Sequence, residues 1–134
     1  MRILHHTVAG DDCVIRIPEN REDILEFISW YEDNDSAPLA LDTETTGLSI
    51  FGKGFNVRLV QFGSTREAWV LQHALFEGVI ISAIRRHAKW VLHNAAFDLQ
   101  ALNRVYGITI EEMTPKVADT IIMSKLIVPH RAGG

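Results

Sequence analysis

The segment LALDTETTGL (39–48) constrains the fold of this chain more than any other. It begins with an apolar run, continues into Asp42 and Glu44, and breaks at Gly47. A short apolar run bounded by turn residues predicts a buried strand, here over 39–43. Because side chains alternate along a strand, the two carboxylates at its exit point to the same side. Charge at the edge of a core is costly unless something compensates it, so this strand end predicts a partner for both acids.

The rest of the chain predicts strands and helices around that strand. Strands are expected over 3–8, 13–18, 56–64, 68–72, 89–94 and 116–120, and helices over 21–33, 76–88, 95–107 and 120–128. Asn20 is expected to cap the first helix and Asn94 the third. Strict alternation along 56–64 places Val57 and Val60 on opposite sides. The order of elements indicates an α/β fold, a mixed sheet with helices on its faces.

Length and charge limit the class of protein. A chain of 134 residues with a net charge of −4 predicts one domain, 1–134, in which a hairpin and a helix over 1–36 lead into the core. No apolar run approaches the roughly 20 residues of a membrane span, so no membrane partner is expected and the cytoplasm is the expected compartment. The acidic balance excludes a stand-alone protein that holds long duplex DNA, but it allows contact with a few nucleotides through a metal ion.

Three acids are expected at one edge of the sheet. Asp42 and Glu44 follow one strand, and Asp98 lies in the first turn of the helix that follows strand 89–94. If these strands are neighbours, the three carboxylates converge. Converging carboxylates repel one another unless they bind a cation, and a few hard oxygen ligands suit Mg²⁺ or Mn²⁺. Two such ions about 4 Å apart can cleave a phosphodiester.

Each of these residues also has an ordinary structural explanation. A single D-x-E pair is often a turn acid, and the helix dipole favours an acid such as Asp98 in a first turn. Asn94 alone is most simply a helix cap. Lys53 and Arg58 could approach a phosphate backbone, although solvated surface is the expected role for both. Only the joint arrangement of the acids indicates a function.

Two motifs together resemble a known family. DTETTGL, followed some fifty residues later by VLHNAAFD, resembles the first two motifs of the DEDD-type 3′–5′ exonucleases, which include the proofreading domains of DNA polymerases and ribonuclease D-like enzymes. VRLVQFG with AWVL, and ADTIIMSKLI, are similar to elements of the bacterial and phage family A polymerases. The likeness covers about 37–128. It implies a ribonuclease H-like fold with three antiparallel strands followed by parallel strands.

The resemblance also implies roles for the acids. Asp42 would bridge two Mg²⁺ or Mn²⁺ ions. Glu44 would bind the first ion and help to orient the attacking water. Asp98 would hold the second ion, chiefly through water.

Further residues would meet the nucleotide at the 3′ end. The backbone around Thr45 and the side chain of Leu48 would contact this terminal nucleotide. Asn94 and Phe97 would line its pocket, Phe97 more as packing than as direct contact. Asp119 matches a position that is not a metal ligand in the family, and its expected role is to cap a helix that begins at Thr120.

One part of the family pattern is missing. The family carries a fourth carboxylate in a third motif, Y-x-x-x-D or H-x-x-x-x-D, and these 134 residues contain no such motif. His130 comes too soon after Asp98 for the family spacing. The fourth carboxylate is therefore expected beyond Gly134, in a longer exonuclease–polymerase chain. A short form that lacks part of the site is the alternative.

Three functions are left open. The leading hypothesis is a proofreading 3′–5′ exonuclease that acts on the single-stranded 3′ end of DNA, with a polymerase domain in the same chain or in a partner chain. The first alternative is a ribonuclease D-like enzyme that acts on the 3′ end of RNA, since the acids cannot distinguish RNA from DNA. The second is a non-catalytic nucleic-acid-binding or interaction module with an incomplete metal site.

Overall fold

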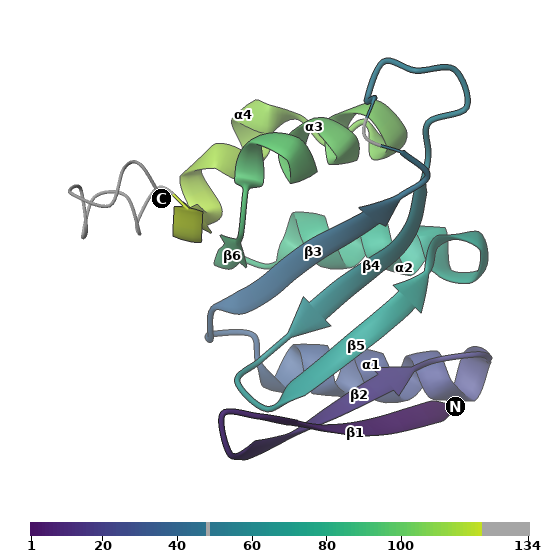
Figure 1. The fold of residues 1–134 in the computed structure, drawn as a ribbon, viewed down its shortest axis with the longest axis vertical. Coiled ribbons are helices and arrows are strands. Elements are labelled where there is room, and N and C mark those ends of the chain that lie inside the picture. Colours follow the sequence, from purple (N-terminus) through teal and green to yellow (C-terminus); the bar gives the residue numbers. More distant parts are fainter. Residues whose placement is uncertain (48, 122–134) are drawn as a thin grey trace.

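A single seven-stranded sheet organises the structure, a computed structural model that describes residues 1–47 and 49–121 (Figure 1). The strands are β1 (Arg2–Val8), β2 (Asp11–Ile17), β3 (Leu39–Thr45), β4 (Val57–Gly63), β5 (Glu67–Gln72), β6 (Trp90–Leu92) and β7 (Val117–Asp119). The helices are α1 (Arg21–Asp33), α2 (His73–Arg86), α3 (Ala95–Tyr106), α4 (Ile110–Met113) and a 3₁₀ turn η1 (Thr114–Lys116).

The order of the strands explains where the acids lie. The sheet runs β1-β2-β5-β4-β3-β6-β7. β3, β4 and β5 are antiparallel neighbours, whereas β6 pairs parallel with β3, and β7 pairs parallel with β6. The expected mixed sheet, antiparallel first and parallel afterwards, is confirmed. Because β3 and β6 are parallel neighbours, the segments that follow them leave the sheet at the same end.

The N-terminal hairpin extends this sheet. β1 and β2 are antiparallel and are joined by a two-residue turn, Ala9–Gly10, in which both residues have positive φ. β2 then pairs parallel with β5, and the Arg16 guanidinium lies 2.7 Å from the Glu67 carboxylate. The hairpin was expected, but its place as an outer part of the main sheet was not.

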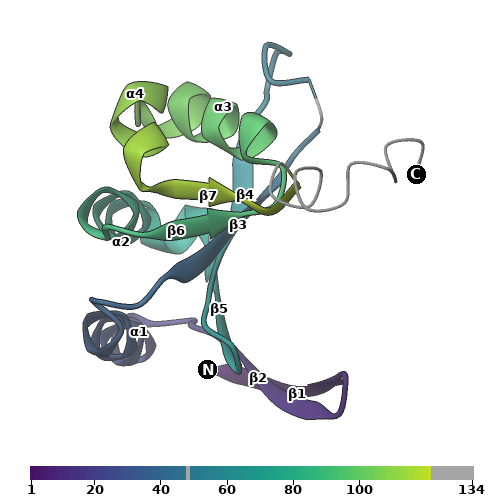
Figure 2. The ribbon, with the colours of Figure 1, turned by 90° about the vertical axis from the view of Figure 1, so that its left-hand side faces the viewer.

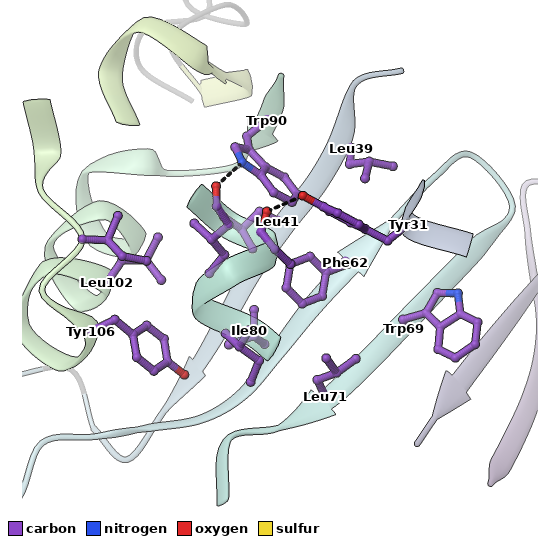
Figure 3. Packing of buried hydrophobic residues seen from close by; sticks show 14 of the residues in the cluster. Tyr31, Leu39, Leu41, Phe62, Trp69, Leu71, Ile80, Trp90, Leu102 and Tyr106 are labelled. Atoms are coloured by element: carbon purple, nitrogen blue, oxygen red, sulfur yellow. Dashed lines mark hydrogen bonds between the residues drawn. The ribbon is translucent and has the colours of Figure 1, made fainter. Parts of the chain in front are cut away.

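Helices cover both faces of the twisted sheet (Figure 2). α1 and α2 lie on one side, and α3 and α4 lie over the other side at the end formed by β6 and β7. Two polar atoms in the core bond to backbone carbonyls of α2: the Tyr31 hydroxyl donates to Ala83 at 2.8 Å, and the Trp90 indole donates to Ile84 at 3.1 Å (Figure 3). These bonds satisfy buried donors that would otherwise destabilise the core.

The helix boundaries differ in part from the expected ones. α1 matches its prediction, and Asn20 caps it by accepting a hydrogen bond from the amide of Asp23. α2 begins and ends earlier than 76–88, and Phe76 within it has non-helical backbone angles. α4 and η1 were not expected. Of the helix expected over 120–128, most residues lie outside the described part of the chain.

β4 contains one extra residue relative to β3. Glu44 lies opposite Leu59, but Thr45 lies opposite Val57, so the pairing shifts at Arg58. This bulge allows both Val57 and Val60 to be buried, which makes the prediction of strict alternation wrong at this point. It also leaves Arg58 exposed on the strand next to Glu44.

No helix in the described residues has both the length and the apolar character needed to span a membrane.

Candidate active site at the carboxyl end of β3

β3 presents its two acids on the solvent side of the sheet. Leu39 and Leu41 are buried in the core, whereas Asp42 and Glu44 are exposed. The strand continues through Thr45, so both acids lie within its last four residues rather than after its end. Alternation thus puts the carboxylates on one face while the apolar residues hold the strand in place.

Asp98 reaches β3 because β6 is short. β6 pairs with β3 only at Leu39 and Ala40, so the chain leaves the sheet before it comes level with Thr43. α3 then begins at Ala95, and its first turn carries Asp98 to the open edge of β3, where the Thr43 hydroxyl donates a hydrogen bond to Asp98 Oδ1. The structure therefore brings the second motif against the first.

The surroundings of Asp98 disfavour its negative charge. The residue is only 3% exposed. Burial raises the pKa of this carboxyl to about 6; the hydrogen bond from Thr43 lowers it, and the nearby charge of Asp42 raises it further. Asp42 and Asp98 are thus close enough to repel each other. A cation at this place would offset that repulsion.

Asp119 fixes the start of α3. Its carboxylate accepts hydrogen bonds from the amides of Asn94 at 3.3 Å and Ala95 at 2.9 Å. It also accepts one from the amide of Ile121 at 2.9 Å, as expected for a cap of the following helix. One carboxylate on β7 therefore satisfies amide groups of two segments, and it sets the position of the turn that carries Asp98.

Asn94 does not cap α3 with its side chain. It adopts a left-handed conformation with φ 66° and ψ 59°, and its side chain makes no capping hydrogen bond. The expected cap was wrong because Asp119, which is remote in the sequence, accepts the amide bonds instead. The exposed Asn94 side chain is therefore not committed to the helix end, and its expected role at a nucleotide is unaffected.

The other residues expected at the nucleotide lie on both sides of the acids. Thr45 is half-buried and donates its hydroxyl to the carbonyl of Gly47 at 2.6 Å. Phe97 is half-buried in the first turn of α3. Leu48 lies outside the described residues.

Arg58 contacts Glu44 across the strand pair. Its guanidinium lies 3.8 Å from the Glu44 carboxylate, and both side chains are more than half exposed. An exposed pair at this distance is weak, so Glu44 can exchange Arg58 for another cation at little cost.

The carboxylates of Asp42, Glu44 and Asp98 are suitable ligands for a hard cation, but the three are not arranged as a formed metal site. In the part of the chain that the structure describes, no group of three or more His, Cys, Asp or Glu side chains is placed to hold a metal ion. However, Asp42 and Asp98 interact, and Glu44 is on the same face of β3 as Asp42. Carboxylates with few other protein ligands suit Mg²⁺ or Mn²⁺, which keep water and substrate oxygens in their shell.

Three residues at this site were missed or given another role from the sequence. Thr43 was not expected to contact Asp98, Arg58 was expected at the surface or near a phosphate backbone but not beside Glu44, and Asp119 was expected to cap only the following helix. The Thr43 contact depends on the length of β6, and the double role of Asp119 depends on the pairing of β6 with β7. Neither leaves a local pattern in the sequence.

Known proteins share both the sequence and the fold. A profile of the 3′–5′ exonuclease family matches residues 15–131. DNA polymerases of Mycobacterium phages D29 and L5 are 40% and 43% identical to this chain, over 97% and 98% of it but over only 22% and 23% of their own length. The chain thus spans about a fifth to a quarter of these relatives. The structure of Brucella melitensis NrnC with bound Mg²⁺ is 26% identical, with a TM-score of 0.54, and matches 84% of this chain and 50% of that one.

Proposed function

The chain belongs to the 3′–5′ exonuclease family, and on this premise we propose that it hydrolyses the terminal phosphodiester at the 3′ end of single-stranded DNA. The observation that carries the proposal is the contact between the two motif segments, in which Thr43 of β3 bonds to Asp98 of α3. This contact brings Asp98 to the strand that carries Asp42 and Glu44, which supports a site at the end of the sheet where substrates of open α/β sheets bind.

We propose that residues 1–134 act as one exonuclease domain of a phage-type DNA polymerase. The continuous sheet from β1 to β7 supports one domain, and the identity to the two phage polymerases supports the attachment to a polymerase. A polymerase domain in the same or a partner chain would supply the basic surface that a chain with net charge −4 lacks.

Asp42, Glu44 and Asp98 are the proposed ligands of the divalent cations, Mg²⁺ or Mn²⁺. Bound there, such ions would activate a water molecule and stabilise the leaving oxygen. Asp42 raises the pKa of Asp98 and shares a face of β3 with Glu44, so its loss is expected to affect the site most. A complete site for two ions needs the fourth carboxylate of the third motif, which is proposed to lie in a longer chain.

The remaining residues are proposed to hold the strand. Asn94 and the segment around Thr45 flank the acids and can bond to the terminal nucleotide through side-chain and backbone groups. Phe97 is proposed to shape the pocket by packing. Leu48 is proposed to contact the terminal nucleotide.

Digestion of labelled oligonucleotides tests the function. The chain, and a version extended through its downstream coding sequence, are incubated with 5′-labelled single-stranded DNA or RNA and Mg²⁺ or Mn²⁺. The proposal predicts progressive shortening from the 3′ end, lost in Asp42→Ala and retained in Glu26→Gln, an exposed acid on α1. Faster digestion of RNA would assign the ribonuclease D-like alternative. Equal activity of wild type and Asp42→Ala would contradict the site, and inactivity of both forms of the chain would favour a non-catalytic module.

A further inference from the structure

The loop between β3 and β4, which follows the strand of Asp42 and Glu44, carries an exposed aromatic residue. Residues 46–56 connect the strand of Asp42 and Glu44 to its neighbour, and the described part of this loop, 46–47 and 49–56, projects beyond the end of the sheet (Figure 1). Phe51 in this loop is 86% exposed, more than any other large hydrophobic residue in the described part of the chain. No contact within the described fold accounts for an aromatic side chain at this place.

The loop is shaped by its own hydrogen bonds. The amide of Thr46 donates to the carbonyl of Asn56 at 2.9 Å, and the amide of Asn56 donates to the Thr46 hydroxyl at 2.9 Å, which closes its base. At its tip, the amide of Gly52 donates to the carbonyl of Ser49 at 2.9 Å. A Cβ on Gly52 would lie 3.0 Å from that carbonyl oxygen, so glycine allows this close approach without a shift of Ser49. Phe51 therefore lies exposed to solvent in a turn that is closed by the hydrogen bond from Gly52 to Ser49.

The loop carries a positive charge. Between Glu44 and Glu67 the sequence contains no acid, Lys53 is the one charged residue of the loop, and Arg58 is the second residue of β4. Lys53 is exposed and lines a hollow of about 200 Å³ together with Gly52 and Phe55. In a chain of net charge −4, Lys53 therefore lies on the loop that leaves the strand of the acids, and Arg58 lies 3.8 Å from Glu44, at a site whose proposed substrate is a polyanion.

We propose that Phe51 and Lys53 bind the single strand that leads to the active site, with a base stacked on the Phe51 ring and a phosphate on the Lys53 ammonium. The inference rests on the proposed function, because it names where the substrate of that site is held. An exposed ring can stack on any base, and a basic side chain beside it can neutralise the backbone, which together give binding without sequence preference. The turn at Gly52 orders the loop beforehand and so lowers the entropy cost of binding.

Binding of a labelled single strand without hydrolysis tests this inference. Fluorescence anisotropy is measured for a 5′-labelled oligo(dT) strand in EDTA with the 134-residue chain and its variants. Phe51→Ala is expected to weaken binding at least fivefold, in line with the loss of one stacked base. Phe51→Trp should restore binding to within about twofold of wild type, since it keeps a stacking face. Lys53→Ala should weaken binding and reduce its dependence on salt.

Leu75→Ala is the matched control, since Leu75 is also an exposed apolar residue, 54% exposed on α2. It should bind the strand as wild type does. Equal affinities of wild type and Phe51→Ala would overturn the inference, and the digestion assay of the proposed function would be unaffected. The same Phe51→Ala defect in a chain that digests no oligonucleotide would support the strand contact while the proposed activity fails. Absence of any strand binding by wild type would overturn the inference.

Discussion

The Thr43 hydroxyl donates a hydrogen bond to Oδ1 of Asp98 and so joins β3 to the first turn of α3. The two residues belong to different motifs, and the contact is made at the edge of β3 that β6 leaves open. It supplies a partner for the carboxylate of a residue that is only 3% exposed. The acid that the sequence predicts as a metal ligand is therefore held by the strand that carries the other two.

Thr43→Val should destabilise the fold. Valine has nearly the shape of threonine but removes the hydroxyl donor to buried Asp98, so the free energy of unfolding should fall by about 1–3 kcal/mol. Urea denaturation measures the change. Thr45→Val is the control, because the Thr45 hydroxyl bonds in an exposed position. Equal losses in both variants would show that the hydroxyl of Thr43 has no special role.

Asp98→Asn should stabilise the metal-free protein at pH 7.5. The pKa of Asp98 is raised to about 6 from an ordinary value of 3.8. Between pH 3.8 and about pH 6 the folded state therefore binds more protons than the unfolded state. The free energy of unfolding consequently falls as the pH rises through this window. Asparagine removes the charge and keeps an acceptor for Thr43, which predicts a gain of about 1–3 kcal/mol.

Thermal unfolding from pH 4 to pH 8 checks this effect. The loss of stability of wild type between about pH 4 and pH 6 should be smaller in Asp98→Asn. Parallel pH profiles for the two proteins would contradict the assignment of this pKa to Asp98.

Asp119→Ala should loosen the start of α3. The variant leaves the amides of Asn94 and Ala95 without the acceptors they now have, which should cost about 1–3 kcal/mol of unfolding free energy. Hydrogen exchange at the Ala95 amide should become faster by more than the global loss of stability explains. In Asp119→Asn, which keeps one acceptor, the exchange rate at Ala95 should fall between those of wild type and Asp119→Ala. Unchanged exchange at Ala95 in Asp119→Ala would contradict the anchoring role.

Arg58→Ala should raise the affinity of the site for Mn²⁺. Arg58 lies 3.8 Å from Glu44 and competes for its carboxylate. Stability should change by less than about 1 kcal/mol, because the pair is exposed. Lys53→Ala is the control, since it removes the same charge without a contact to Glu44. If both variants raised the Mn²⁺ affinity equally, the gain would come from the change in net charge and not from the contact of Arg58 with Glu44.

Much of the fold could be predicted because its determinants are local. Asn20 caps α1 through a hydrogen bond to a residue only three positions away. β3 is predicted by an apolar run that turn residues follow. α4 could have been predicted too, since Thr109 and Glu112 form a capping box and have its T-x-x-E spacing. The sequence thus contained a usable pattern that was missed.

The remaining features depend on contacts between remote segments. The parallel pairing of β2 with β5 and the bulge at Arg58 come from how strands meet, and neither has a fixed local pattern. The acceptor for the start of α3 is Asp119 on β7 rather than Asn94 at the helix itself. In the candidate site, the acids could be picked by residue type and spacing, but the bond from Thr43 to Asp98 depends on β6 ending early.

Titration with Mn²⁺, followed by the electron paramagnetic resonance of the free ion, tests the central claim most directly. The account predicts that the wild-type chain removes free Mn²⁺ saturably in the millimolar range or below, and that Asp42→Asn and Asp98→Asn weaken this binding strongly while Glu26→Gln does not. Because binding is measured without substrate, the result does not depend on catalysis, and it reports on the part of the site that Asp42, Glu44 and Asp98 form. Identical titrations for wild type and Asp42→Asn would contradict the claim that the acids at the end of β3 form a metal site.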